Sequence, residues 1–285
     1  MTIAYACAMG HAPGILAWTD AAPAEQKDRL YAAFAELRRR LEAAQLDALI
    51  VFTAEHWANF FLDHMSAFCI GAAGRFDGPI EPWLKVPKVE IPGDEQLARA
   101  IVTACYDNDL EPSFAQEMHF DHGTMIPLHF LTPDMNLPVV PIVINTLAPP
   151  FPSARRCLRL GRVVGDMLRH SNKRVGIVAT GGMSHDPGER NHGYIDSTFD
   201  RQFLEHMTEG NVEALGTYTS EALSAAGAGA VELLNWIALA GALQSFRGQV
   251  LSYEPVKPWA TGIGAMFFEL SERVSSREAG RSAQS

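Results

Sequence analysis

The chain has 285 residues, of which 47% are hydrophobic and 20% are charged, and its net charge is −10 with histidine neutral. Such a composition is typical of a globular protein with a large core, and the acidic balance argues against a nucleic-acid or anionic-membrane surface, because phosphate contacts need clustered Lys and Arg. No apolar run approaches the ~20 residues that span a bilayer, the N-terminus lacks the pattern of a signal peptide, and the four cysteines are widely spaced, so we expect a cytoplasmic protein without disulfides.

Apolar stretches and amphipathic stretches alternate through the first two thirds of the chain. Strands are predicted at Thr2–Met9, Asp47–Thr53, Val86–Pro92 (an edge strand), Val139–Asn145, Arg174–Thr180 and Gly262–Leu270. Helices are predicted at Ala24–Ala44, Asp94–Asn108, Ser153–Arg169 and, with breaks, from Phe199 to about Gly248. This alternation predicts an α/β fold with a central, mostly parallel or mixed β-sheet flanked by helices.

No Pro/Gly-rich linker or internal repeat divides the chain into two parts. We therefore expect a single domain over residues 1–275. The remaining residues, 276–285, are small and polar without apolar periodicity, which predicts a disordered C-terminal tail.

Histidines recur at the ends of the predicted strands. His11, His56 and His185 each follow a strand within a few residues, and His122 lies in the segment HFDHG. Ligand sites of open α/β sheets form at the carboxyl ends of the strands. A single histidine would more often be an ordinary surface or core residue, but several at matching strand ends favour one shared site.

Two imidazoles and one carboxylate, with positions left open, are the ligand set expected for non-haem Fe(II) that binds oxygen. His11 and His56 are the imidazole candidates, because each leaves a strand onto a short loop. Glu55 adjoins His56 but should point away from it. Glu232 lies in an apolar segment, where a carboxylate is costly unless it is paired or binds a metal, although it could instead be a residue favoured at a helix start.

Other chemical motifs are weak or missing. The chain has no P-loop, no GxGxxG after a strand and no GxSxG, and the adjacent Ser184 and His185 cannot form a productive dyad. Asp121 and Asp186 each adjoin a histidine. We expect both to be solvated in loops rather than to orient an imidazole ring.

Several sequence blocks occur together in one order: GHAPG, EHWANFF followed by AFCIG, HFDHG, ATGGMSHDP and VELLNW. In these blocks, which span most of the chain, the sequence resembles the class III (LigB-type) extradiol ring-cleavage dioxygenases, a family that includes protocatechuate 4,5-dioxygenase β chains and 2,3-dihydroxyphenylpropionate 1,2-dioxygenase. The resemblance implies Fe(II) held by His11, His56 and Glu232. It also implies that His185 is an acid/base residue of the substrate pocket and that His122 is a second histidine there.

The implied reaction is meta-cleavage of a catechol-type ring with O2, in aromatic catabolism, by a single catalytic domain of LigB-type fold. One metal with exchangeable positions can bind a diol and oxygen, and an imidazole that titrates near ~6.5 can serve as base and acid. Trp57 and Phe60 are expected to line the pocket for the aromatic ring, although core aromatics have similar spacing. The expected partners are a small aromatic diol, O2 and further copies of the chain in a homo-oligomer.

Two alternatives stay open at this point. The same three ligands could hold Zn(II) in a metal-dependent hydrolase, which would consume no oxygen. The chain could also be a metal-binding member of this fold without catalytic activity, although the presence of both His122 and His185 beside the three ligands argues against that alternative.

Overall fold

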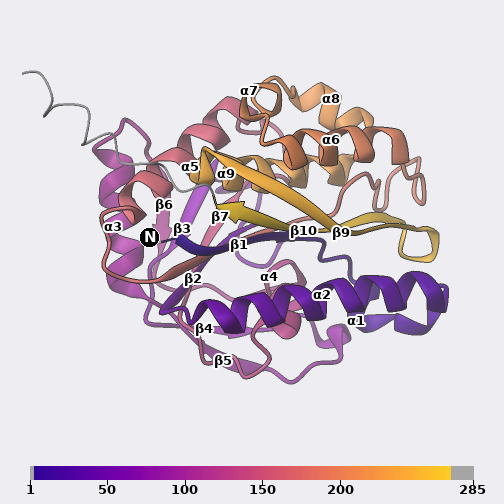
Figure 1. Cartoon of the computed structure of the whole chain (residues 1–285), viewed down its shortest axis with the longest axis horizontal. Helices are drawn as coiled ribbons and strands as arrows, with labels where there is room; N and C mark the ends of the chain where they lie inside the picture. The colour runs from indigo at the N-terminus through magenta and orange to yellow at the C-terminus, as the bar shows by residue number, and fades with distance from the viewer. Residues whose placement is uncertain (1–2, 271–285) are drawn as a thin grey trace, which may run out of the picture.

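The computed structural model describes residues 3–270, and eight of their strands form one mixed sheet in the order β6-β3-β7-β2-β8-β1-β10-β9 (Figure 1). These strands are β1 (Ile3–Met9), β2 (Ala48–Thr53), β3 (Phe68–Gly71), β6 (Ser113–Ala115), β7 (Val139–Ile144), β8 (Val175–Thr180), β9 (Phe246–Val256) and β10 (Thr261–Leu270). Strands β7, β2, β8 and β1 are parallel, whereas β10 and β9 continue the sheet in antiparallel pairing. The predicted α/β class with a mixed sheet is confirmed. The predicted tail lies outside the described residues.

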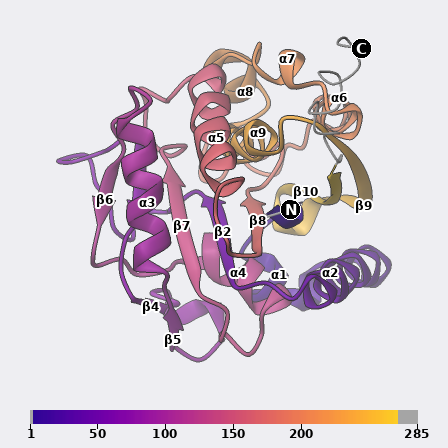
Figure 2. The same cartoon turned by 60° about the vertical axis from the view of Figure 1, so that its left-hand side comes forward.

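Helices cover both faces of this sheet (Figure 2). One face packs on α3 (Glu95–Tyr106), α5 (Ala154–Leu168), α6 (Ser197–Glu209), α7 (Val212–Leu215), α8 (Ser220–Ala225) and α9 (Leu233–Leu243). The other packs on α1 (Gly14–Ala17), α2 (Ala24–Ala44) and α4 (His122–Leu131). The central strands are buried on both faces, as their continuous apolar sequence requires. Among residues 3–270, no helix is long and apolar enough to cross a membrane.

Short 3-10 turns and a small second sheet complete the fold. The turns are η1 (Thr19–Ala21), η2 (Pro82–Leu84), η3 (Ala228–Glu232) and η4 (Lys257–Trp259). Strand β4 (Arg75–Gly78) pairs with β5 (Val89–Pro92). Of the segment Val86–Pro92, predicted as an edge strand, residues Val89–Pro92 form a strand, and it belongs to this separate two-stranded sheet.

The prediction of helix up to about Gly248 is wrong at its C-terminal end. Helix α9 ends at Leu243, and strand β9 begins at Phe246. Strand β9 lies at the edge of the sheet, and exposed polar residues such as Arg247 and Gln249 interrupt its apolar pattern. An edge strand of this kind has no continuous apolar run by which sequence analysis could find it.

Helices α5 and α9 pack closely through glycines. A Cβ atom on Gly161 would lie 1.8 Å from the carbonyl oxygen of Ala238. Gly161→Ala should therefore lower the free energy of unfolding by about 1–3 kcal/mol, because the helices must move apart. In an exposed helix, a Gly→Ala substitution would instead raise the free energy of unfolding by roughly 1 kcal/mol. Urea unfolding measures the difference, with Gly74→Ala as the control, since nothing lies within 4 Å of that position.

Candidate active site

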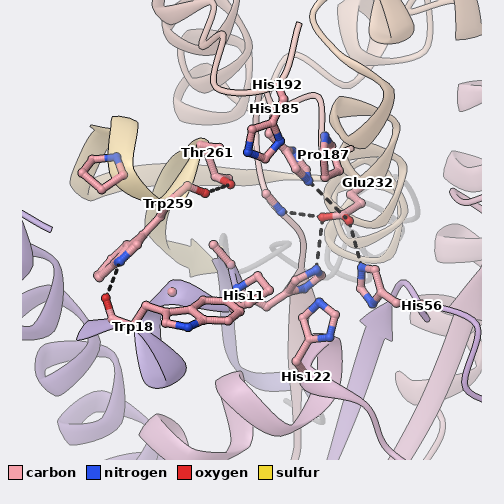
Figure 3. Close-up of a pocket in the computed structure, with 16 residues that line it drawn as sticks. His11, Trp18, His56, His122, His185, Pro187, His192, Glu232, Trp259 and Thr261 are labelled. Atoms are coloured by element: carbon pink, nitrogen blue, oxygen red, sulfur yellow. Dashed lines mark hydrogen bonds and ion pairs between the residues drawn. The ribbon is translucent and has the colours of Figure 1, made fainter. Parts of the chain in front are cut away.

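Three of the histidines converge because their strands are neighbours in the sheet. Strands β1 and β2 both pair in parallel with β8, so the carboxyl ends of all three strands lie at one edge. His11, His56 and His185 follow these ends, and with His122 and Glu232 they line one cavity of about 390 Å³ (Figure 3). The structure thus brings together the five residues that the sequence singled out for metal binding and catalysis.

Glu232 faces the two imidazoles that follow β1 and β2. Its Oε2 lies 3.2 Å from His11 Nε2, and its Oε1 lies 3.2 Å from His56 Nε2. The backbone N–H of Gly182 donates a hydrogen bond to Oε2. Burial alone would raise the pKa of Glu232, but the electrostatic effects of the nearby His11 and His185 side chains and the hydrogen bonds with His11 and His56 lower it well below its usual value. The carboxylate is therefore ionised at neutral pH.

Gly181 and Gly182 shape the turn after β8. Gly181 has a φ of 151°, in a region that side chains disfavour, and a Cβ atom there would lie 3.0 Å from the Glu232 backbone oxygen. A Cβ atom on Gly182 would lie 2.7 Å from Cε1 of His185. The Gly-Gly pair therefore lets both the carboxylate and the His185 ring approach the strand end.

A buried chain of hydroxyl groups fixes the ring of His11. Thr180 Oγ1 donates to Thr53 Oγ1, and Thr53 Oγ1 in turn donates to the carbonyl oxygen of Ala54. The Thr180 proton is thereby used, so Thr180 Oγ1 accepts a hydrogen bond from His11 Nδ1, 3.1 Å away. His11 Nε2 is thereby turned toward Glu232, as the nitrogen of a metal ligand would be.

Asp121 fixes the ring of His56. It is buried, and its Oδ2 accepts from the His56 backbone N–H and lies 3.1 Å from His56 Nδ1, while its Oδ1 accepts from Gly123 at the start of α4. The expectation that Asp121 is solvated in a loop is wrong, because the carboxylate lies between α4 and the loop after β2. Burial would lower the pKa of His56, but Asp121 and then Glu232 raise it well above its usual value. Against the effect of burial, His56 lowers the pKa of Asp121 to about 2.

His122 begins α4 and lies against the other two imidazoles. Its ring centroid lies 4.0 Å from that of His56 and 5.6 Å from that of His11. Its Nδ1 lies 2.7 Å from Glu81 Oε1, so the carboxylate accepts that N–H. Burial and then the charge of His56 lower the pKa of His122. Nitrogens of His11, His56 and His122 all lie within 4.8 Å of one another, so His122 is a geometric alternative to Glu232 as third metal ligand.

The environment of His185 defines which ring nitrogen carries the proton. Its Nδ1 lies 2.8 Å from the carbonyl oxygen of Met183, which can only accept, so Nδ1 is the donor. Its Nε2 is then free and lies 3.8 Å from Glu232 Oε1. A Cβ atom on Gly229 would lie 2.1 Å from this Nε2. The preceding residue, Ser184, is anchored by backbone and side chain to the buried Asp200.

The structure also places three further residues for which sequence analysis gave expectations: Glu55, Trp57 and Phe60. Glu55 points away from the cavity as predicted, and its Oε2 accepts from the backbone N–H groups of Ala58 and Asn59. Trp57 and Phe60 do not line the cavity: the chain turns at Trp57, which has a φ of 61° and is exposed, and Phe60 borders a separate small cavity beside Glu55. Trp57 and Phe60 therefore do not form the pocket for the aromatic ring.

Asp186 is also buried rather than solvated. Its Oδ1 accepts from the backbone N–H of Ala228, and its Oδ2 accepts from that of Asn191. It joins the loop after His185 to the turn that carries Glu232. The expectation for Asp186 is wrong because residues 186 and 228 are distant in sequence but adjacent in the fold.

The outer wall of the cavity comes from residues that the sequence did not single out. Trp18 and Trp259 line it, and Trp259 Nε1 donates to the Trp18 carbonyl oxygen at 2.9 Å (Figure 3). Gly14 leaves room for the Trp259 ring, since a Cβ atom there would lie 2.1 Å from it. No local pattern could have paired two tryptophans so far apart in the chain.

The residues present fit a divalent metal ion. Two imidazole Nε2 atoms face one ionised carboxylate, and an acceptor holds the far nitrogen of each imidazole, which is how histidine ligands are oriented for a metal. The set of two histidines and one carboxylate is the one associated with non-haem iron. The apolar outer wall beside it offers space for a flat ligand.

Comparison with known proteins agrees with this geometry. Residues 5–264 match the family described as the catalytic LigB subunit of aromatic ring-opening dioxygenase. The chain belongs to this family, and its fold is of LigB type.

Curated relatives cover nearly the whole chain. A protein of Burkholderia vietnamiensis, named 2,3-dihydroxyphenylpropionate/2,3-dihydroxicinnamic acid 1,2-dioxygenase, is 29% identical over 323 residues, which cover 94% of this chain and 98% of the relative. A protein of the same name from Rhodococcus globerulus is 26% identical and covers 84% of this chain and 90% of its own length. The crystal structure of an uncharacterized protein from Escherichia coli covers 92% of this chain and 98% of its own, with a TM-score of 0.58 and 14% identity, and shows the fold alone.

Proposed function

We propose that this protein is an Fe(II)-dependent extradiol dioxygenase that cleaves a catechol-type ring with O2, within one catalytic domain over residues 1–275. The observation that carries the proposal is the convergence of His11, His56 and Glu232 beside His185, at the bottom of a cavity with an aromatic outer wall. The relatives named as dioxygenases support the same reaction class.

In this proposal His11, His56 and Glu232 hold the iron. When bound, Fe(II) with open positions would bind the diol oxygens and O2 and pass electron density between them. The chain itself orients the ligands: Thr180 fixes His11 and Asp121 fixes His56. His11 and Glu232 are buried and His56 is partly buried, which limits the access of water to the three donors.

His185 is the proposed acid/base residue. Its Nδ1 proton is held by Met183 O, so Nε2 is free to take a phenolic proton from the diol and later return it to the product side. His122, whose Nδ1 donates to Glu81, presents its other nitrogen to the same cavity and is proposed to position the diol or oxygen.

The decisive experiment is anaerobic loading with Fe(II), followed by a panel of catechols, gallates and dihydroxypyridines. Oxygen uptake together with a yellow ring-fission product is the expected result. A Zn(II)-dependent hydrolase would consume no oxygen and would be active with zinc. A non-catalytic member would bind metal without turnover. The four buried free cysteines support a cytoplasmic location, and the homo-oligomer stays a prediction.

Asp121→Asn should weaken iron binding without removing any metal ligand. The amide oxygen of the substituted side chain could still accept from the backbone of His56, but it would no longer hold the imidazole Nδ1–H with a charged acceptor. Loss of such an orienting partner typically costs about 10–100-fold in metal affinity. A competition titration with a chelator measures it. Asp63→Asn, on an exposed loop position, is the control. Unchanged affinity in Asp121→Asn would show that this carboxylate serves only the start of α4.

A further inference from the structure

The outer half of the cavity differs in character from the metal half. The inner half carries four histidines and Glu232, whereas Trp18 and Trp259 line the outer half. Figure 3 shows the Trp18 indole reaching toward His11 and His122, across the cavity from His185 and Glu232. A substituent on a bound catechol ring would extend toward the Trp18 and Trp259 indoles.

The Trp259 indole makes a hydrogen bond, and the Trp18 indole, which is 54% exposed, stacks on a neighbouring ring. Trp18 stacks on Trp83 with ring centroids 5.6 Å apart and an interplanar angle of 13°, and its carbonyl oxygen accepts from Trp259 Nε1. Lys85 Nζ donates to the carbonyl oxygen of Ala17, which anchors the adjoining backbone. Side chains held in this way present a ready flat, apolar surface, so stacking a ligand on them costs little ordering entropy.

Cationic side chains lie beside the cavity lining rather than in it, since Lys85 Nζ reaches the carbonyl oxygen of Ala17 next to Trp18. Among the described residues that line the cavity, none is lysine or arginine. Lys257 is exposed beside the lining residue Pro258 but does not line the cavity itself. His192, at the exposed rim, accepts a hydrogen bond from the Gly188 N–H through Nδ1, which leaves Nε2 as the ring nitrogen that can face a ligand. A carboxylate drawn into this space would lose its hydration and gain no cationic partner, whereas an uncharged substituent would lose far less hydration.

We infer that this chain takes catechols whose ring substituent is uncharged and preferably flat, and that it discriminates against catechols with a carboxylate. The inference rests on the proposed function, since it places the diol at the inner histidines. The ligands inferred for this chain therefore differ from the acids after which the curated relatives are named.

The test compares 2,3-dihydroxyphenylpropionate with its methyl ester, which lacks the negative charge and carries one additional methyl group. The Fe(II)-loaded protein should show kcat/KM at least about tenfold higher for the ester, a ratio that corresponds to ~1.4 kcal/mol. Quenching of tryptophan fluorescence under anaerobic conditions measures binding of the same pair without turnover, with 2,3-dihydroxybiphenyl as a neutral third ligand whose substituent is an aromatic ring. Equal or better use of the acid would overturn the inference.

Two arginine variants test where the selectivity arises. Trp18→Arg places a cation on the outer wall and should shift the acid-to-ester ratio toward the acid by about tenfold or more. Leu62→Arg adds the same charge at an exposed site that does not line the cavity and should leave the ratio unchanged. An equal shift in both variants would overturn the inference, because selectivity would then follow overall charge.

A preference for the acid that disappears in His192→Gln would also overturn the inference and would identify His192 as a carboxylate anchor. If no catechol is cleaved at all, the proposed reaction fails. The anaerobic binding ratio of ester to acid still decides the selectivity in that case, so the two failures are distinguishable.

Discussion

His56→Ala should abolish iron retention while the protein keeps its fold. His56 lies on a loop beyond β2 rather than in the core, and its Nε2 faces Glu232 Oε1 at 3.2 Å, so its loss removes one metal donor and little packing. Iron content after anaerobic Fe(II) loading and desalting measures the effect, and circular dichroism measures the fold. His64→Ala is the matched control, because His64 is an exposed histidine of the same loop that does not line the cavity. Stoichiometric iron in His56→Ala would show that the proposed ligand set is wrong.

The same measurement decides between the two candidates for third ligand. Glu232 supplies the ionised carboxylate that faces both imidazoles, so Glu232→Ala should also lose iron. His122 is held by Glu81 and lies close enough to complete a three-histidine set, but we expect His122→Ala to retain iron. The reverse outcome, iron lost from His122→Ala and kept by Glu232→Ala, would assign the third position to His122.

The inner half of the site could be predicted because it follows from sheet topology. Short apolar runs identified β1, β2 and β8, and parallel neighbours present their carboxyl ends at one edge, so His11, His56 and His185 had to approach one another once these strands paired. Glu232 was recognisable for a different reason: an acid in an apolar segment needs a partner, and the structure supplies two imidazoles and a backbone N–H.

The outer half could not be predicted, because it depends on contacts between distant segments without periodic pattern. Trp18 and Trp259 belong to short 3-10 segments or their borders, and their hydrogen bond joins opposite ends of the described chain. Trp57 and Phe60 closely follow His56, a proposed metal ligand, yet the turn at Trp57 carries both away from the cavity. Asp121 was misjudged for a related reason, since an acid beside a histidine gives no sign of burial until α4 packs against the loop after β2.

His185→Phe should keep its iron and still bind a catechol, but ring cleavage should slow by about 10²–10⁴-fold, the usual contribution of a general acid/base residue. The reason is geometric. Met183 O holds the Nδ1 proton, so the nitrogen that faces the cavity is the one able to accept a proton, and it lies 3.8 Å from Glu232 rather than at a ligand position. Iron content, anaerobic catechol binding and single-turnover oxygen uptake separate these three properties. Loss of iron would make His185 a ligand instead.

Gly229→Ala is a companion variant that retains His185 but displaces its imidazole ring. The added Cβ would lie 2.1 Å from His185 Nε2, so the ring must move, and misplacement by about 1 Å can cost ~10²-fold in rate. Iron content should be unchanged, because the Glu232 side chain is fixed separately by Gly182 and the two ligand histidines. His192→Phe, at the rim of the same cavity, should lose far less activity. Near-normal ring cleavage by both His185→Phe and Gly229→Ala would exclude His185 from proton transfer, and its hydrogen bond to Met183 would then serve only to hold the turn after β8.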